Sequence, residues 1–98
     1  MKNILANINR AFENRIRLGI MSVLVVNTSM DFISLREILE VTDGNLASHL
    51  RALEECGYIT MEKKFVNRKP NTTYTLTTEG SESFKSHIRA LEELIKSQ

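Results

Sequence analysis

Several hydrogen-bonding side chains lie between residues 42 and 51, interleaved with leucines at helical spacing. Leu46, Leu50 and Leu53 recur at i, i+4 and i+7, which predicts a helix with one narrow apolar face. Asparagine can form paired hydrogen bonds with adenine, arginine with guanine, and serine or threonine with bases or phosphates. The residues on this helix that could do such chemistry are Thr42, Asn45, Ser48, His49 and Arg51.

Local signals place both ends of this helix. The Thr42 hydroxyl can cap the first turn, and Asp43 suits the positive end of the helix dipole. Gly57 is typical of the position that follows a helix end. We therefore expect a helix within residues 42–58. Its first half, Asp43–Arg51, can face a partner, whereas the acidic, core-forming part Leu53–Gly57 should face away from it.

A second short helix is expected directly before it. Ser34 and Glu37 have the spacing of a capping box, which predicts a helix start at Ser34, and the polar residues 42–44 require its end near Val41. Two short helices joined by a tight turn form a helix-turn-helix, whose second helix enters the major groove of DNA.

After Gly57 the apolar period changes from helical to alternating, which predicts two strands. The apolar positions of these strands are Ile59, Met61, Phe65, Tyr74 and Leu76. Between them, Asn67–Asn71 is polar and contains the single proline, so we expect it to form the turn of a β-hairpin.

Basic residues gather on this predicted hairpin, the wing. They are Lys63, Lys64, Arg68 and Lys69. Such residues would neutralise phosphates and provide binding that depends on salt but not on sequence. Neighbouring strand residues face opposite sides, so at most one of Lys63 and Lys64 points at DNA through its strand position; the pair could instead guard a strand edge against aggregation. We assign wing and backbone contacts to Ser34, Arg36, Lys64, Arg68, Lys69 and Asn71.

Apolar stripes at the two ends of the chain predict further helices. A short helix is expected within Ile4–Phe12, a longer one within Ile16–Leu24, and a last helix capped by Thr78. The last helix could simply cover the core, but so small a chain has little core left for it, and we favour a dimer interface. Its residues would be Ile4, Leu5, Ile8, Phe84, Ile88, Leu91 and Ile95, within segments 1–12 and 80–98.

Composition excludes several classes of protein. The chain has 98 residues, 42% hydrophobic and 26% charged, as expected of one globular domain spanning residues 1–98. No apolar run reaches the roughly 18 residues that span a bilayer, and the first ten residues lack the pattern of a signal peptide, so we expect a cytoplasmic protein. The net charge is only +1, but positive charge is concentrated in residues 1–36 and 58–75.

Three motifs resemble winged-helix transcriptional regulators of the MarR and ArsR group. Asp43–Ile59 is similar to the recognition helix of these proteins, Arg15–Met21 to their first core helix, and Leu76–Gly80 to the LTxxG entry into their last helix. The resemblance implies an α+β, mostly helical winged helix-turn-helix fold: two N-terminal helices, a short strand, the helix-turn-helix, the wing and a C-terminal helix. It also implies homodimers that bind double-stranded DNA, most often as repressors.

The sequence departs from metal-sensing members of this group. Those proteins have cysteines near the helix before the recognition helix, but Ser34–Val41 contains neither Cys nor His. With one cysteine in the chain, we expect no metal site, no cofactor and no disulfide. No catalytic constellation or phosphate-binding loop is present either, which argues against an enzyme. The sequence does not indicate whether a small-molecule effector binds.

Some residues allow two interpretations. His49 could face DNA or be an ordinary helix residue, and Arg51 could contact a base or pair with Glu54 or Glu55. We expect Cys56 to be buried beside the helix end and His87 to lie at the surface. The alternative function is a winged-helix module that binds another protein without DNA, which the acidic segment 37–57 would favour.

Overall fold

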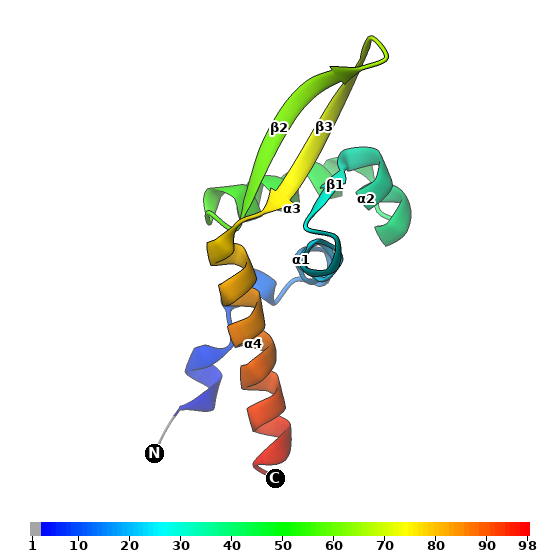
Figure 1. Ribbon diagram of the computed structural model, residues 1–98. Helices are drawn as coiled ribbons and strands as arrows, with labels where there is room; N and C mark the ends of the chain where they lie inside the picture. The colour runs from blue at the N-terminus through cyan, green and yellow to red at the C-terminus, as the bar shows by residue number, and fades with distance from the viewer. Residues whose placement is uncertain (1–2) are drawn as a thin grey trace.

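A computed structural model describes residues 3–98 and shows a helical body from which a long hairpin projects (Figure 1). The elements in chain order are η1 (Ile4–Asn7), η2 (Arg10–Phe12), α1 (Arg15–Asn27), β1 (Ser29–Asp31), α2 (Phe32–Leu39), α3 (Asp43–Glu55), β2 (Ile59–Val66), β3 (Lys69–Leu76) and α4 (Thr78–Lys96). This is the expected winged helix-turn-helix order. Within residues 3–98, no helix combines the length and the apolar character needed to cross a membrane.

The leucine stripe of α3 forms the centre of the core, as predicted. Leu46, Leu50 and Leu53 are at most 1% exposed. They belong to one cluster with buried residues of α1 and α2, including Ile20 and Leu35. Burial on this scale fixes which side of α3 faces inward, because each large apolar side chain contributes about 1.5–3 kcal/mol when it leaves water.

The wing is longer and its turn tighter than the sequence suggested. The sheet has the order β1-β3-β2, and β2 pairs with β3 from Ile59↔Leu76 out to Val66↔Lys69. Only Asn67 and Arg68 form the turn, both with positive φ, as a two-residue type I′ hairpin turn requires. The expected five-residue turn was wrong because Pro70 is tolerated in β3: β1 pairs only with residues 73–75, so β3 is an edge strand there.

The N-terminal helix is also different from the prediction. Residues 4–12 form two short 3-10 turns rather than one α-helix. The side chain of Asn9 accepts a hydrogen bond from the Ala11 amide, and that of Asn14 accepts from Ile16 and Arg17. Each asparagine is thus an N-cap at which a new helical segment begins, so the chain restarts at residues 10 and 15 instead of continuing as one helix.

Two helices begin at residues other than the predicted ones. α2 starts at Phe32 because the carboxylate of Asp31, not Ser34, is the cap and accepts from the Ser34 amide at 2.7 Å. A carboxylate makes the stronger, charge-assisted bond, and this bond lowers the pKa of Asp31. α2 ends at Leu39, before the left-handed Glu40. α4 is capped by Thr77 rather than Thr78.

The junction between the wing and α4 explains the glycine of the LTxxG motif. Gly80 is buried, and a Cβ there would overlap the carbonyl oxygen of Tyr58. The same carbonyl accepts a hydrogen bond from the Thr77 amide at 3.0 Å, and the Thr77 hydroxyl donates to the carbonyl oxygen of Gly57 at 2.8 Å. The start of α4 is therefore held against the end of α3 by backbone contacts that leave no space for a side chain.

The N-terminal segment is attached to α4 through a buried histidine. The amide of Asn9 donates to Nδ1 of His87 at 3.0 Å, and the Asn9 side chain donates to the Tyr58 hydroxyl at 2.9 Å. The Phe12 ring packs edge-on against Phe84 and His87. His87 is only 4% exposed, so its predicted surface position was wrong. Cys56, predicted to be buried, is exposed at the C-cap of α3.

We predict that Gly80→Ala lowers the free energy of unfolding by about 2 kcal/mol or more, because the new methyl group must displace the Tyr58 backbone. Gly44→Ala is the matched control, since nothing lies within 4 Å of its Cβ in the first turn of α3. That change should stabilise the fold by up to about 1 kcal/mol. Urea denaturation measures both, and equal effects of the two substitutions would contradict the proposed overlap.

We also predict that the chain loses stability as the pH falls below 6.5. Burial lowers the pKa of His87 below its ordinary 6.5, although Glu13 opposes the shift. The unfolded chain then takes up a proton more readily than the folded chain, so the free energy of unfolding decreases with pH below that value. His87→Gln should reduce this decrease in urea midpoint, whereas Lys85→Gln on the exposed side of α4 should not. An unchanged decrease in His87→Gln would refute the assignment.

Candidate nucleic-acid interface

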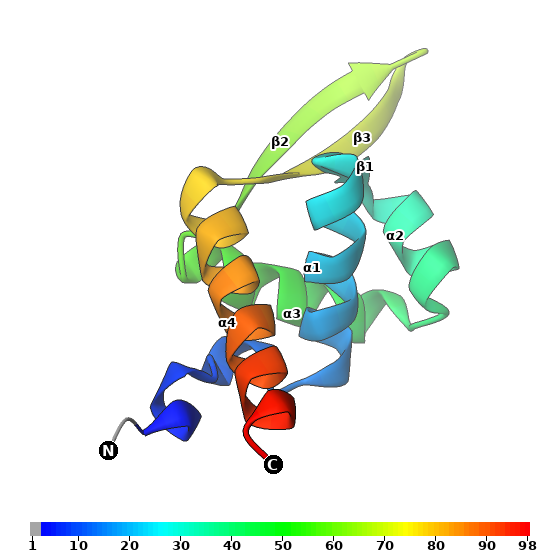
Figure 2. The same cartoon turned by 60° about the horizontal axis from the view of Figure 1, so that its bottom comes forward.

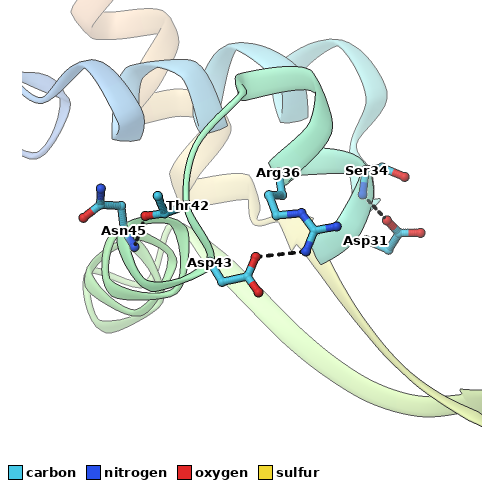
Figure 3. Close-up of polar contacts among 6 residues, drawn as sticks. All are labelled: Asp31, Ser34, Arg36, Thr42, Asp43 and Asn45. Carbon is cyan, nitrogen blue, oxygen red and sulfur yellow. Dashed lines mark hydrogen bonds and ion pairs between the residues drawn. The ribbon is translucent and has the colours of Figure 1, made fainter.

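The turn between α2 and α3 presents the start of α3 at the surface (Figure 3). Glu40 adopts a left-handed conformation with φ 53°, and the Thr42 hydroxyl accepts from the Asn45 amide at 3.3 Å. Arg36 of α2 forms an ion pair with Asp43 of α3 at 2.9 Å. The two side chains are 36% and 67% exposed, so the pair contributes little stability, and the buried core residues of α2 and α3 position the two helices.

The first half of α3 has the exposed face that the sequence predicted. Asn45, Ser48 and Arg51 are exposed, whereas the leucines between them are buried. Thr42 is exposed as well, although its hydroxyl already accepts the capping hydrogen bond. Free polar groups on this face of α3 are therefore available to a partner.

His49 faces another helix rather than this free surface. Its Nδ1 lies 3.1 Å from Nη1 of Arg17 on α1, and a guanidinium can only donate, so Nδ1 accepts. Burial and the Arg17 charge both lower the pKa of His49. Arg17 also donates to the carbonyl of Ala11 at 2.6 Å. His49 thus links α3 to α1, and this contact favours the structural interpretation of the residue.

A groove of about 430 Å³ separates α3 from the wing. Its lining residues are Phe32, Ala47, Arg51, Glu54, Met61, Lys63, Thr72 and Tyr74. Burial raises the pKa of Tyr74, the charge of Glu54 adds to this shift and that of Arg51 opposes it, so both charges lie near the tyrosine. Residues 3–98 contain no ion pair between Arg51 and Glu54 or Glu55. The groove therefore combines two cations with one carboxylate.

The wing places its two neighbouring lysines on opposite sides. Lys63 lines the groove, whereas Lys64 lies across the strand from Asn71 and 4.0 Å from Glu62. Arg68 and Lys69 are exposed at the tip. Of the two lysines that could neutralise phosphates, Lys64 was the one assigned a backbone contact from the sequence. The strand alternation places Lys63 on the groove side, because Ile59 is buried and Lys63 follows it on the same face of β2.

Two further candidates have partners within the chain. The Asn71 side chain accepts from the Thr73 hydroxyl at 3.0 Å. Ser34 is half-buried, and its amide donates to the Asp31 carboxylate at 2.7 Å. Asp31 is the last residue of β1, which pairs with β3, so this bond holds the start of α2 beside the wing. Arg36 is likewise engaged by Asp43.

The residues predicted to form a dimer interface lie at the end of the molecule opposite the wing. In both views η1 lies beside α4, far from the tip of the wing (Figure 2). Leu5 and Ile95 are 68% and 71% exposed, and Leu91 is 37% exposed. Ile4, Ile8 and Ile88 are half-buried. Phe84 is instead buried inside the chain against Phe12, so it is not free to join an interface; residues 1–2 of the expected segment lie outside the described residues.

A family model described as a winged helix DNA-binding domain matches residues 16–95. The chain belongs to this family. Its resemblance to winged-helix regulators, inferred above from three motifs, is thereby confirmed. Membership of this family, together with the similarity to a transcriptional regulator homologue, indicates that the chain binds DNA and regulates transcription.

Similar proteins support the winged-helix assignment. An uncharacterized protein of Methanocaldococcus jannaschii is 33% identical over 87 residues, which are 89% of this chain and 95% of that protein. The structure of a transcriptional regulator homologue from Pyrococcus horikoshii OT3 is 32% identical and has a TM-score of 0.86, with 96% of this chain and 91% of that chain covered. YusO from Bacillus subtilis shares the fold at 15% identity, with a TM-score of 0.76 and 96% and 66% covered.

Proposed function

We propose that this winged-helix chain is a homodimeric, sequence-specific repressor that inserts α3 into the major groove and places its wing along the DNA backbone. The observation that supports this most strongly is the groove between α3 and the wing, lined by Arg51 on the helix and Lys63 on the hairpin. The exposed residues Asn45 and Ser48 continue the surface of the helix toward its N-terminus. A duplex can supply both ligands at once, base edges to α3 and phosphates to the lysine.

In this proposal the polar residues of α3 and of the wing differ in what they recognise. Asn45, Ser48 and Arg51 are suited to base edges, since their amide, hydroxyl and guanidinium groups can distinguish one base from another. Lys63, Arg68 and Lys69 are suited to phosphates, which position the protein but contain no sequence information. Repression then needs no further chemistry, because a protein bound in the major groove obstructs polymerase.

The affinity for DNA should fall steeply as the salt concentration rises, and Lys63 should contribute more to this salt dependence than Lys64. We predict that Lys63→Gln makes the slope of log affinity against log salt about one unit less steep, because one phosphate contact is lost. Lys64→Gln is the matched control: it removes the same charge from the same strand, but on the far side. Fluorescence anisotropy with a labelled random duplex over a salt series measures both slopes.

The same experiment separates DNA binding from the alternative function. A wild-type protein with a flat salt dependence, or with no binding, would contradict the proposed function and favour a winged-helix module that docks another protein. The carboxylate of Glu54 in the groove is the observation that favours this alternative, because it repels phosphate. If instead both lysine variants change the slope equally, the wing contacts DNA without the orientation proposed here.

The dimer would form through the surface next to η1 and the end of α4. We predict that Ile95→Lys shifts the chain from dimer toward monomer in sedimentation equilibrium, because an exposed apolar side chain at the proposed interface becomes charged. Val26→Lys, 80% exposed at the end of α1, is the control and should leave the mass unchanged. A monomeric wild-type chain, or equal behaviour of the two variants, would rule this interface out.

A further inference from the structure

An aromatic side chain lies at the tip of the wing, where the chain has no core to cover. Along the groove-facing side of β2, exposure rises from 1% at Ile59 to 38% at Met61 and 77% at Phe65. Figure 1 shows why: the hairpin continues well beyond the helical body. Phe65 therefore makes no contribution to the core, and it leaves a large apolar surface in water on an exposed hairpin.

The backbone of Phe65 belongs to a paired strand close to a tight turn. Phe65 pairs directly with Pro70 across the hairpin, and the fixed φ of proline stiffens the opposite strand. The strands are joined by only two residues, Asn67 and Arg68, so the last pairs of the ladder have little freedom. The exposed ring is therefore carried by a hydrogen-bonded hairpin and not by a long loop.

The charges around the ring indicate the chemistry of its partner. Lys63 lies on the same side of β2 as Phe65, and Arg68 and Lys69 follow at the tip. The single acidic residue of β2, Glu62, faces the other side, next to Lys64. A partner for this tip must therefore be anionic and must also accept an apolar ring. Double-stranded DNA meets both conditions, because its phosphates flank stacked bases between which apolar side chains can insert.

We propose that Phe65 is a wedge that inserts between base pairs in the minor groove beside the site read by α3, and that it bends the duplex there. This inference rests on the proposed DNA binding. Partial unstacking is least costly at flexible pyrimidine–purine steps such as TA. Phe65 thus contributes sequence preference without a hydrogen bond, at a position separate from the bases that α3 contacts.

The test is the end-to-end distance of a duplex, measured by energy transfer between dyes at its two ends. The probe is a duplex of about 30 base pairs containing TA steps, and a second duplex replaces them with stiff A-tracts. Saturating wild-type protein should bring the ends of the first duplex together, equivalent to a bend of about 20–90°. Phe65→Ala should lose most of this bend while keeping the salt slope, because the phosphate contacts remain.

Val66→Ala is the matched control, since Val66 is the next residue, is 48% exposed and faces the other side of the hairpin. It should bend DNA as the wild type does. Equal bending by wild type and Phe65→Ala, or equal bending of both duplexes by wild type, would overturn the wedge. If wild type binds neither duplex, the proposed function fails as well; binding with a steep salt slope but no bend refutes the wedge alone.

Discussion

The burial of the α3 leucine stripe is the constraint on which the other features depend. Leu46, Leu50 and Leu53 occupy one narrow side of the helix and are almost completely removed from water. A rotation of α3 about its axis would expose these leucines, so the rotational setting of the helix is fixed. The residues opposite the stripe, such as Ser48 and Arg51, must then face outward. The same packing that stabilises the fold thus determines which side chains a partner can reach.

Tyr58 connects the parts that surround this helix. Its amide donates to Leu53 at the end of α3, and its carbonyl accepts from Thr77 at the start of α4. Its hydroxyl accepts from Asn9, so the N-terminal segment is attached to the same residue. Gly80 then packs so closely on its backbone that the start of α4 has only one position. The wing and α4 are consequently oriented by one junction, although they lie at opposite ends of the molecule (Figure 1).

The sequence predicted those features that depend on one dominant local signal. The leucine period, the Thr42 cap and the Gly57 helix end were all visible in the chain, and the structure has them. The errors occurred where two local signals compete or where distant residues decide. Asp31 prevailed over Ser34 as a cap because a carboxylate is the stronger acceptor. His87 lies on the buried face of α4, three residues after Phe84, but the partner that its imidazole needs there, the Asn9 amide, is 78 residues earlier and is not visible locally.

The low net charge of this winged-helix chain is compatible with DNA binding because the charges are separated in space. The wing is basic, whereas acidic residues are concentrated on and around the helix-turn-helix. Glu54 is an exception to this separation of charges, since its carboxylate lies in the same groove as the cations of Arg51 and Lys63. In the proposed complex it would repel any phosphate that approaches out of register, whereas a cytosine amino group could donate to it. In that complex such a carboxylate would lower affinity for DNA in general but raise discrimination between sequences, as expected when specificity includes a repulsive element.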